Sequence, residues 1–256
     1  MSDKVNVQDL LQAGVHFGHL KSKWNPSMKP YVFMEKDGIH IIDLNKTIKK
    51  LEVAANAAKN MAKSGKKILF VATKKQASDI VAEAAKSVNM PYVTERWLGG
   101  MLTNFVTVRK SVKKIGTIEK MFSDDTVTNL AKRERLILNR EKEKLEKVLG
   151  GITDLTRMPS AVFIVDIKKE DIALLEANKL GITSIAMVDT NSDPNLVDFP
   201  IPANDDASKS ISIVTKVITE AIAEGLAERQ ILKQEAKAKK EKEQAEKAAE
   251  APQEEE

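Results

Sequence analysis

Five aspartates lie near the ends of apolar segments that we expect to form β-strands. Asp166 ends the run AVFIVD, Asp189 ends the run TSIAMVD, and Asp193, Asp205 and Asp206 follow in nearby loops. The carboxyl ends of strands form the usual ligand crevice of a doubly wound sheet, and Mg²⁺ favours carboxylate ligands. These residues could therefore form a phosphoryl-transfer or receiver-type site. Aspartate also caps helices and closes turns through local hydrogen bonds, and we favour that structural interpretation.

Two histidines, His16 and His19, are three residues apart in the segment GVHFGH. With a carboxylate such as Asp189 or Asp205 they could hold a structural metal ion. Histidines between glycines and beside an aromatic residue are more often packed, hydrogen-bonded structural groups. We therefore assign no metal ligand and no cofactor, and the possibility of a structural ion stays open.

The first strong apolar run is not followed by the glycine-rich loop that nucleotide-binding folds carry after a strand. The run KILFVAT leads directly into KKQA, so Lys74 and Lys75 stand where such a loop needs glycines. Nucleophile-elbow and kinase signatures are also missing. We therefore predict that the protein is not an enzyme.

Basic residues recur in pairs along the first 150 residues. This part holds 28 Lys/Arg and 16 Asp/Glu, whereas residues 151–256 hold 13 and 21. Basic pairs at loop ends and on extended helices are typical of contact with a nucleic-acid backbone. The alternative is a charged surface that faces only solvent. It explains any one of these pairs well, but it explains all six less well. The pairs are Lys49-Lys50, Lys66-Lys67, Lys74-Lys75, Arg109-Lys110, Lys113-Lys114 and Lys132-Arg133.

Apolar periodicity predicts an α/β domain with a parallel sheet covered on both faces. Expected strands are residues 67–73, 91–94, 161–166, 183–189 and 198–201, and expected helices are 47–63, 76–88, 170–179 and 207–225. Residues 5–45 resist assignment to long regular elements, although their aromatic content indicates that they pack onto the domain.

Residues 105–149 interrupt the α/β pattern. Two helical stretches joined by the polar loop 123–129 predict an antiparallel hairpin that is inserted into the domain. We therefore divide the chain into an N-terminal extension with the first part of the α/β domain (1–104), the hairpin (105–149), a second part of the domain (150–227) and a charged tail (228–256). The tail is expected to be helical or disordered.

Composition narrows the class of protein further. The 256 residues contain no cysteine, which excludes a disulfide scaffold, thiol catalysis and thiolate-held zinc or iron–sulfur sites. The longest apolar runs have five residues, far fewer than the roughly 20 of a membrane span. With no signal-peptide pattern at the N-terminus, we expect a soluble, cytoplasmic protein without a membrane partner.

Long segments of the chain closely resemble the bacterial ribosomal protein S-two family of the small ribosomal subunit. They include LLQAGVHFGH, KWNPSMKPYVF and GIHIIDL within residues 10–44, LFVATKKQA and YVTERWLGGMLTNF within 69–105, and IAMVDTNSDPNLVDFPIPANDDA at 185–207. The segments LGGITDL and PSAVFIVD match as well, so the resemblance covers about residues 5–227.

The resemblance implies a flavodoxin-like domain with a five-stranded parallel sheet and a protruding coiled-coil hairpin. It implies a ribosome-bound protein that binds small-subunit rRNA near the junction of head and body. It also implies help in docking ribosomal protein S-one for messenger RNA engagement in translation, contacts with other small-subunit proteins, and no enzymatic activity. Carried onto this chain, the rRNA contacts would be Lys21, Lys23, Trp24, Asn25, Lys29, Lys74, Lys75, Arg96, Arg109, Lys110 and Lys113.

Two positions depart from the family pattern. Lys21-Ser22-Lys23 stands where arginines are common, which weakens bidentate phosphate contact there. Ala203 replaces a frequent glycine before the NDD segment.

A rival interpretation remains open, in which the hairpin is a coiled-coil adaptor that binds a protein instead of RNA.

Overall fold

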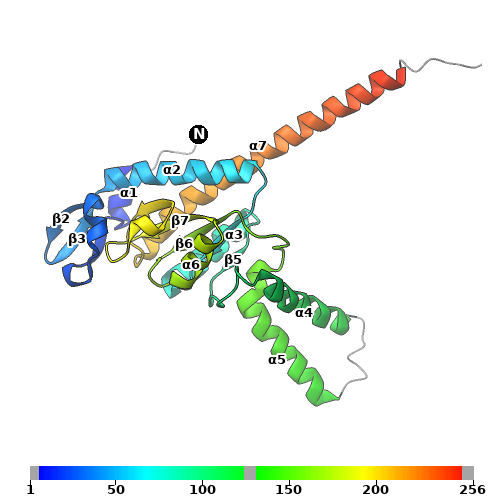
Figure 1. Ribbon diagram of the computed structural model, residues 1–256, viewed down its shortest axis with the longest axis horizontal. Helices are drawn as coiled ribbons and strands as arrows, with labels where there is room; N and C mark the ends of the chain where they lie inside the picture. The colour runs from blue at the N-terminus through cyan, green and yellow to red at the C-terminus, as the bar shows by residue number, and fades with distance from the viewer. Residues whose placement is uncertain (1–5, 124–130, 250–256) are drawn as a thin grey trace, which may run out of the picture.

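A five-stranded parallel sheet forms the centre of the molecule (Figure 1). The computed structural model describes residues 6–123 and 131–249, with side chains described as far as residue 235. The strands are β4 (Ile68–Val71), β5 (Tyr92–Val93), β6 (Ala161–Val165), β7 (Thr183–Val188) and β8 (Phe199–Pro202), in the order β5-β4-β6-β7-β8. Every residue of β4 and β6 is buried, because helices cover both faces of these strands. The predicted α/β fold with a five-stranded parallel sheet is therefore confirmed.

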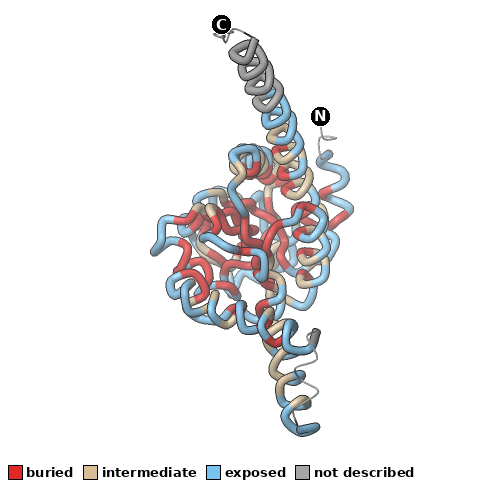
Figure 2. The backbone as a smooth tube through the Cα atoms, turned by 90° about the vertical axis from the view of Figure 1, so that its right-hand side faces the viewer, coloured by how far each residue is buried: buried red, intermediate tan, exposed pale blue. Residues whose placement is uncertain are grey.

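Helices on both faces give the domain three layers, and the buried residues lie between them (Figure 2). On one face, α2 (Leu44–Lys63), α3 (Lys75–Ser87) and α7 (Ser208–Ala249) pack around Phe70 and Phe163, whose ring centroids are 5.3 Å apart. The second core lies on the other face, against α6 (Asp171–Lys179) and the inner ends of α4 (Phe105–Ser123) and α5 (Lys132–Leu149). This arrangement agrees with the flavodoxin-like three-layer prediction.

Helix α7 is longer than the sequence predicted, because it passes Gly225 and continues to Ala249. Gly225 is a contact residue here and not a helix end: a Cβ atom at this position would lie 2.3 Å from the backbone oxygen of Lys59. Glycine thus lets α7 approach α2 closely, and the following Lys, Glu, Gln and Ala residues have high helix propensity. Despite this length, none of the described helices is apolar enough over a sufficient stretch to cross a membrane.

The first 45 residues contain a small antiparallel sheet that the sequence did not reveal. Its strands β1 (Phe17–Leu20), β2 (Val32–Lys36) and β3 (Ile39–Ile42) lie in the order β1-β3-β2, after the short helix α1 (Val7–Gln12). No residue of β2 is buried, so this strand lacks the alternating apolar pattern by which a half-buried strand is recognised.

Helices α4 and α5 leave the sheet domain side by side (Figure 1). Lys114 forms an ion pair with Glu141, and Lys142 Nζ lies 3.4 Å from Glu119 Oε1. Residues 124–130, which hold most of the predicted loop, lie outside the described residues. The coiled-coil hairpin therefore stays a prediction, while the two helices and their contacts are observed.

Candidate nucleic-acid interface

Lys74 lies at the centre of the acidic cluster at the carboxyl ends of the strands. Its Nζ atom is 2.7 Å from Asp206 Oδ1, 2.8 Å from Asp205 Oδ1 and 3.2 Å from Asp166 Oδ2. Burial lowers the pKa of Lys74, but the hydrogen bonds and charges of these carboxylates outweigh it and raise that pKa above its ordinary value. Burial, followed by the charges of Asp166 and Asp189, raises the pKa of Asp205 to about 7. A lysine ammonium group therefore occupies the place that the sequence analysis considered for Mg²⁺.

Three of the five aspartates make the local hydrogen bonds of the structural interpretation. Asp189 Oδ1 accepts from the backbone N–H and from the hydroxyl group of Thr190. Asp166 Oδ1 accepts from the backbone N–H groups of Lys168 and Lys169, each at 3.1 Å. Asp193 Oδ1 accepts from the N–H group of Asn195 at 3.0 Å. These bonds close the turns that follow β6 and β7.

The two histidines are in different environments. His19 Nδ1 lies 3.0 Å from Asp189 Oδ2, and its Nε2 lies 3.5 Å from Asp206 Oδ2. The hydrogen bond with Asp189 raises the pKa of His19, whereas burial lowers the pKa of His16. Donor atoms of His19, Asp205 and Asp206 lie within 4.8 Å of one another and could hold a metal ion. Among the described residues His16 is outside that group, and its ring instead lies 4.0 Å from the ring of Phe17.

The first block of predicted RNA contacts is anchored to the carboxyl-terminal edge of the sheet. The backbone N–H of His19 donates to Thr190 Oγ1 at 2.8 Å, and the N–H of Asn25 donates to the backbone oxygen of Thr190 at 2.9 Å. Asn25 Oδ1 also accepts from the N–H of Ser27, so its side chain starts a 3₁₀ turn. The ring of Trp24 is half-buried, 5.0 Å from the ring of His40.

Seven of the nine predicted cations have exposed side chains, and two make internal contacts. The exposed cations are Lys21, Lys23, Lys29, Lys75, Arg96, Lys110 and Lys113. Lys21 also pairs with Glu35 at 2.9 Å. The internal ones are Lys74, described above, and Arg109, whose Nη1 donates to the backbone oxygen of Leu155 at 2.8 Å. Arg109 thereby ties α4 to the segment that returns to the sheet.

Sequence reasoning missed one polar side chain altogether, the buried carboxylate of Glu176 on α6. It accepts hydrogen bonds from residues 97–103, the loop that connects β5 with α4. Trp97 is buried there, with only 8% of its surface exposed, and is not available for base stacking. The signal that could have found Glu176 is an acidic residue beside Ala173 and Ala177, on the core-facing side of a helix.

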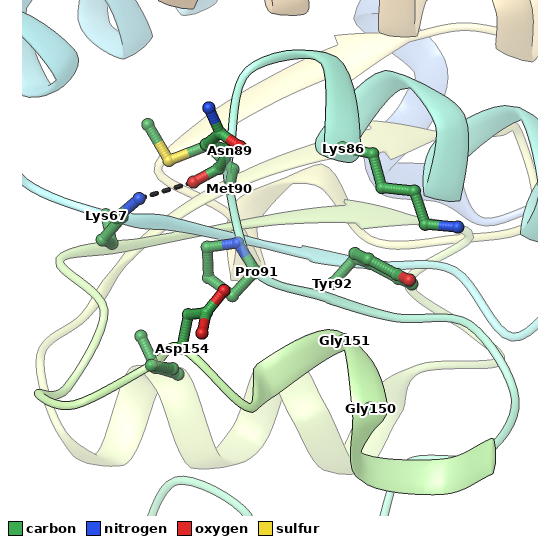
Figure 3. Close-up of a pocket in the computed structure, with 10 residues that line it drawn as sticks. Lys67, Lys86, Asn89, Met90, Pro91, Tyr92, Gly150, Gly151 and Asp154 are labelled. Atoms are coloured by element: carbon green, nitrogen blue, oxygen red, sulfur yellow. Dashed lines mark hydrogen bonds between the residues drawn. The ribbon is translucent and has the colours of Figure 1, made fainter. Parts of the chain in front are cut away.

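A cavity of about 290 Å³ lies near the amino ends of β4 and β5 (Figure 3). Lys67 donates to the backbone oxygen of Asn89, and Lys86 Nζ lies 5.6 Å from the centre of the Tyr92 ring. Figure 3 shows Asp154 on the opposite side of the cavity from Lys86. These contacts account for both lysines without a ligand.

Known proteins match nearly the whole domain. The family model described as "Ribosomal protein S2" matches residues 10–225. The chain belongs to the ribosomal protein S2 family. Relatives named small ribosomal subunit protein uS2 include those of Cytophaga hutchinsonii, 66% identical over 216 residues (84% of this chain, 85% of the relative), and Phocaeicola vulgatus, 64% identical over 211 residues (82% and 76%). The protein of Bacteroides thetaiotaomicron is 63% identical over 211 residues (82% and 76%).

Membership of the ribosomal protein S2 family confirms the resemblance found in the sequence. The family is one of structural proteins and not of enzymes. The internal ion pairs of Lys74 agree with the structural interpretation of the acidic cluster.

Proposed function

We propose that this chain is a structural constituent of the small ribosomal subunit and binds small-subunit rRNA on the ribosome in the cytoplasm. The observation that carries the proposal is the exposure of seven predicted cations, from Lys21 to Lys113, in a chain whose relatives are small-subunit proteins. Exposed lysines act as point charges toward phosphate, while Arg96 can make two parallel hydrogen bonds. By the same family resemblance, the contact lies near the junction of head and body.

Five of the exposed lysines form two groups along the chain. Lys21, Lys23 and Lys29 belong to the N-terminal block on the carboxyl-terminal edge of the sheet, whereas Lys110 and Lys113 lie on α4. The protein would therefore hold the RNA at two separate places. Four other residues that were predicted to contact RNA already have partners for their polar groups or rings within the protein. These residues contribute mainly by holding the two RNA-binding places in position. They are Lys74, Trp24, Asn25 and Arg109.

The proposal includes support for docking of ribosomal protein S-one and for messenger RNA engagement. The small sheet offers an apolar surface for a protein partner, because Phe33 of β2 is 71% exposed and Phe17 of β1 is 48% exposed. Isolated apolar side chains are common on surfaces, but aromatic residues are enriched at interfaces between proteins. Serine substitutions of both residues should leave the protein on the subunit and reduce the amount of S-one bound there.

A sucrose gradient of cell extract tests the central proposal. We expect the protein to co-migrate with small subunits at moderate salt. A double variant, Lys110→Glu with Lys113→Glu, should bind small-subunit rRNA more weakly, and the matched variant Lys216→Glu on α7 should bind it normally. Protein that remains at the top of the gradient would overturn the proposal.

A protein-binding role for α4 and α5 is the second candidate. Five large apolar side chains on these helices are substantially exposed: Val106, Met121, Phe122, Leu136 and Ile137. If the helices bind a protein, the double charge reversal should spare RNA binding and serine substitutions of Leu136 and Ile137 should release the partner.

A further inference from the structure

The carboxylate of Glu176 accepts five hydrogen bonds from one loop. Its Oε1 atom accepts from Trp97 Nε1 at 3.1 Å and from the N–H of Gly100 at 2.7 Å. Its Oε2 atom accepts from the N–H of Leu102 and of Thr103, both at 2.9 Å, and from Thr103 Oγ1 at 3.1 Å. A carboxylate has about four lone-pair positions, so its capacity to accept is filled by this loop.

The donors form an anion-binding nest in the sense used for phosphate sites. Backbone N–H groups converge on one point, and Gly100 reaches the necessary conformation with φ +87°. The anion in this nest is supplied by the protein itself, from a helix more than 70 residues further along the chain. Because Glu176 is only 8% exposed, an RNA phosphate cannot share the nest while this carboxylate fills it.

The charge state of Glu176 agrees with this arrangement. Burial alone raises the pKa of the carboxyl group, but the hydrogen bonds from Thr103, Gly100, Trp97 and Leu102 outweigh burial and hold the pKa below its ordinary value. The side chain is therefore ionised at neutral pH and acts as a strong acceptor.

The loop held by Glu176 connects Arg96 with α4, which both belong to the proposed RNA interface. Arg96 directly precedes Trp97 and is exposed, and the backbone oxygen of Asn104 accepts the first hydrogen bonds of α4, the helix that carries Lys110 and Lys113. A bend in this loop would move both. The tip stays accessible, because a Cβ atom built on Gly99 meets nothing within 4 Å.

We infer that Glu176 is a positioning residue for RNA binding, whose carboxylate fills the nest of residues 97–103 and so fixes Arg96 and α4 before the RNA arrives. The inference rests on the proposed function, and it assigns to α6 a part in RNA binding although Glu176 itself does not touch RNA. Binding to an already ordered loop loses less conformational entropy than binding to a loop that must be ordered.

The first test compares the full-length protein with its Glu176→Ala and Glu176→Gln variants in binding small-subunit rRNA at several salt concentrations. The glutamine substitution keeps the volume of the side chain but presents an amide N–H₂ group to N–H donors. For a variant that remains folded, as judged by circular dichroism, we expect roughly tenfold weaker binding. The slope of log K against log salt should fall by about 1 to 2, as if one or two phosphate contacts were lost.

Glu170→Ala is the matched control. Glu170 immediately precedes the first residue of the same helix, is 3% exposed, and accepts hydrogen bonds from the N–H and hydroxyl groups of Thr73, outside the loop 97–103. This variant should lose stability but keep the salt slope of the unsubstituted protein. Equal slopes for folded Glu176→Gln and the unsubstituted protein would overturn the inference.

Chemical rescue gives a second readout that general destabilisation does not produce. Sodium formate, compared with sodium chloride at equal ionic strength, should restore RNA binding by Glu176→Ala and return the indole N–H resonance of Trp97 toward its original position. Formate should have no such effect on Glu170→Ala. Absence of rescue in folded Glu176→Ala would refute the inference that an anion in this nest orders the loop for RNA binding. Salt-independent RNA binding by the unsubstituted protein would instead refute the proposed function, so the two failures are distinguishable.

Discussion

Replacing Lys74 by Met should destabilise the protein strongly and in a pH-dependent way. The substitution keeps the length of the side chain but removes the ammonium group that contacts Asp166, Asp205 and Asp206. Removing one partner of a buried ion pair costs about 3–5 kcal/mol, since the remaining charge stays buried. Lys74 is 12% exposed and Asp206 is largely in solvent, so we expect the lower end, about 3 kcal/mol at pH 8.

The pH dependence follows from Asp205. Its pKa rises from 3.8 to about 7 in the folded protein, so the ionised form destabilises the fold at high pH and protonation relieves this cost as the pH falls. In Lys74→Met the pKa of Asp205 should rise further, because the nearby positive charge is gone. At pH 5 Asp205 is protonated in both proteins, so the difference in stability between them should shrink by about 1 kcal/mol, since pH 8 lies only about one unit above its pKa of about 7.

Thermal unfolding followed by circular dichroism at pH 8 and pH 5 measures this difference. A loss of about 3 kcal/mol corresponds to a decrease in Tm of roughly 6–10 °C for a chain of this size. Lys75→Met is the matched control, because the adjacent lysine is exposed. Equal losses for the two variants, or an undiminished difference at pH 5, would show that Lys74 does not neutralise the cluster.

Three further predictions concern the path from the sheet into α4 and α5. Gly151→Ala should destabilise the protein by more than about 2 kcal/mol in urea unfolding, because the new Cβ atom would lie 2.2 Å from a backbone oxygen of β5. Gly116→Ala is the control: its Cβ atom meets nothing within 4 Å, so the substitution should stabilise α4 by about 0.5–1 kcal/mol. Arg109→Ala should lower Tm by several degrees, because it removes an internal hydrogen bond, whereas Lys110→Ala should leave Tm unchanged and reduce RNA affinity. A lower Tm for Lys110→Ala than for Arg109→Ala would contradict the assignment of Arg109 as the internal contact. The pKa of Glu176 in the folded protein lies below its ordinary value of 4.5. The stabilisation by this carboxylate should therefore be fully present above pH 4.5 and be lost as the pH falls further. The unfolding free energies of Glu176→Gln and of the unsubstituted protein should accordingly converge in acid.

The central sheet could be predicted because its strands are buried on both faces. Residues of β4 and β6 form continuous apolar runs for that reason, and the helices between them keep a period of 3 to 4. Strand β2 could not be predicted, because its side chains are exposed and the pairing with β3, rather than burial, makes it a strand. The long α7 was left undecided between helix and disorder, since its Lys, Glu and Ala residues are compatible with both.

The roles of individual polar residues depended on contacts between distant parts of the chain. Lys74 and Lys75 are neighbours of the same type, yet only Lys74 meets Asp205 and Asp206, which lie about 130 residues further on. Glu176 likewise acquires its role from a loop that lies more than 70 residues before it. Local spacing carries no information on such pairings, because the order of strands in the sheet decides which loops meet.

The structure also changes what the uneven charge of the sequence implies. Lys59 and Lys63 of the basic half form ion pairs with Glu224 and Glu228 of α7 at distances of 2.9–3.1 Å. Part of the positive charge of the first half and part of the negative charge of the second half therefore neutralise each other where α2 and α7 meet. These contacts lower the pKa of Glu228 to about 2. The net charge of the first 150 residues therefore overstates the charge that is available to RNA.

Counting only the exposed cations among the predicted RNA contacts gives a sharper expectation. If all seven, from Lys21 to Lys113, contact phosphate, the slope of log K against log salt should be about −5 to −6, because each contact contributes roughly −0.7 to −0.9. A filter-binding titration with small-subunit rRNA over a range of moderate salt concentrations measures it. A steeper slope would require cations beyond these seven, such as those of α5. A slope of about −2 would mean that only one of the two places, the N-terminal block or α4, meets the RNA.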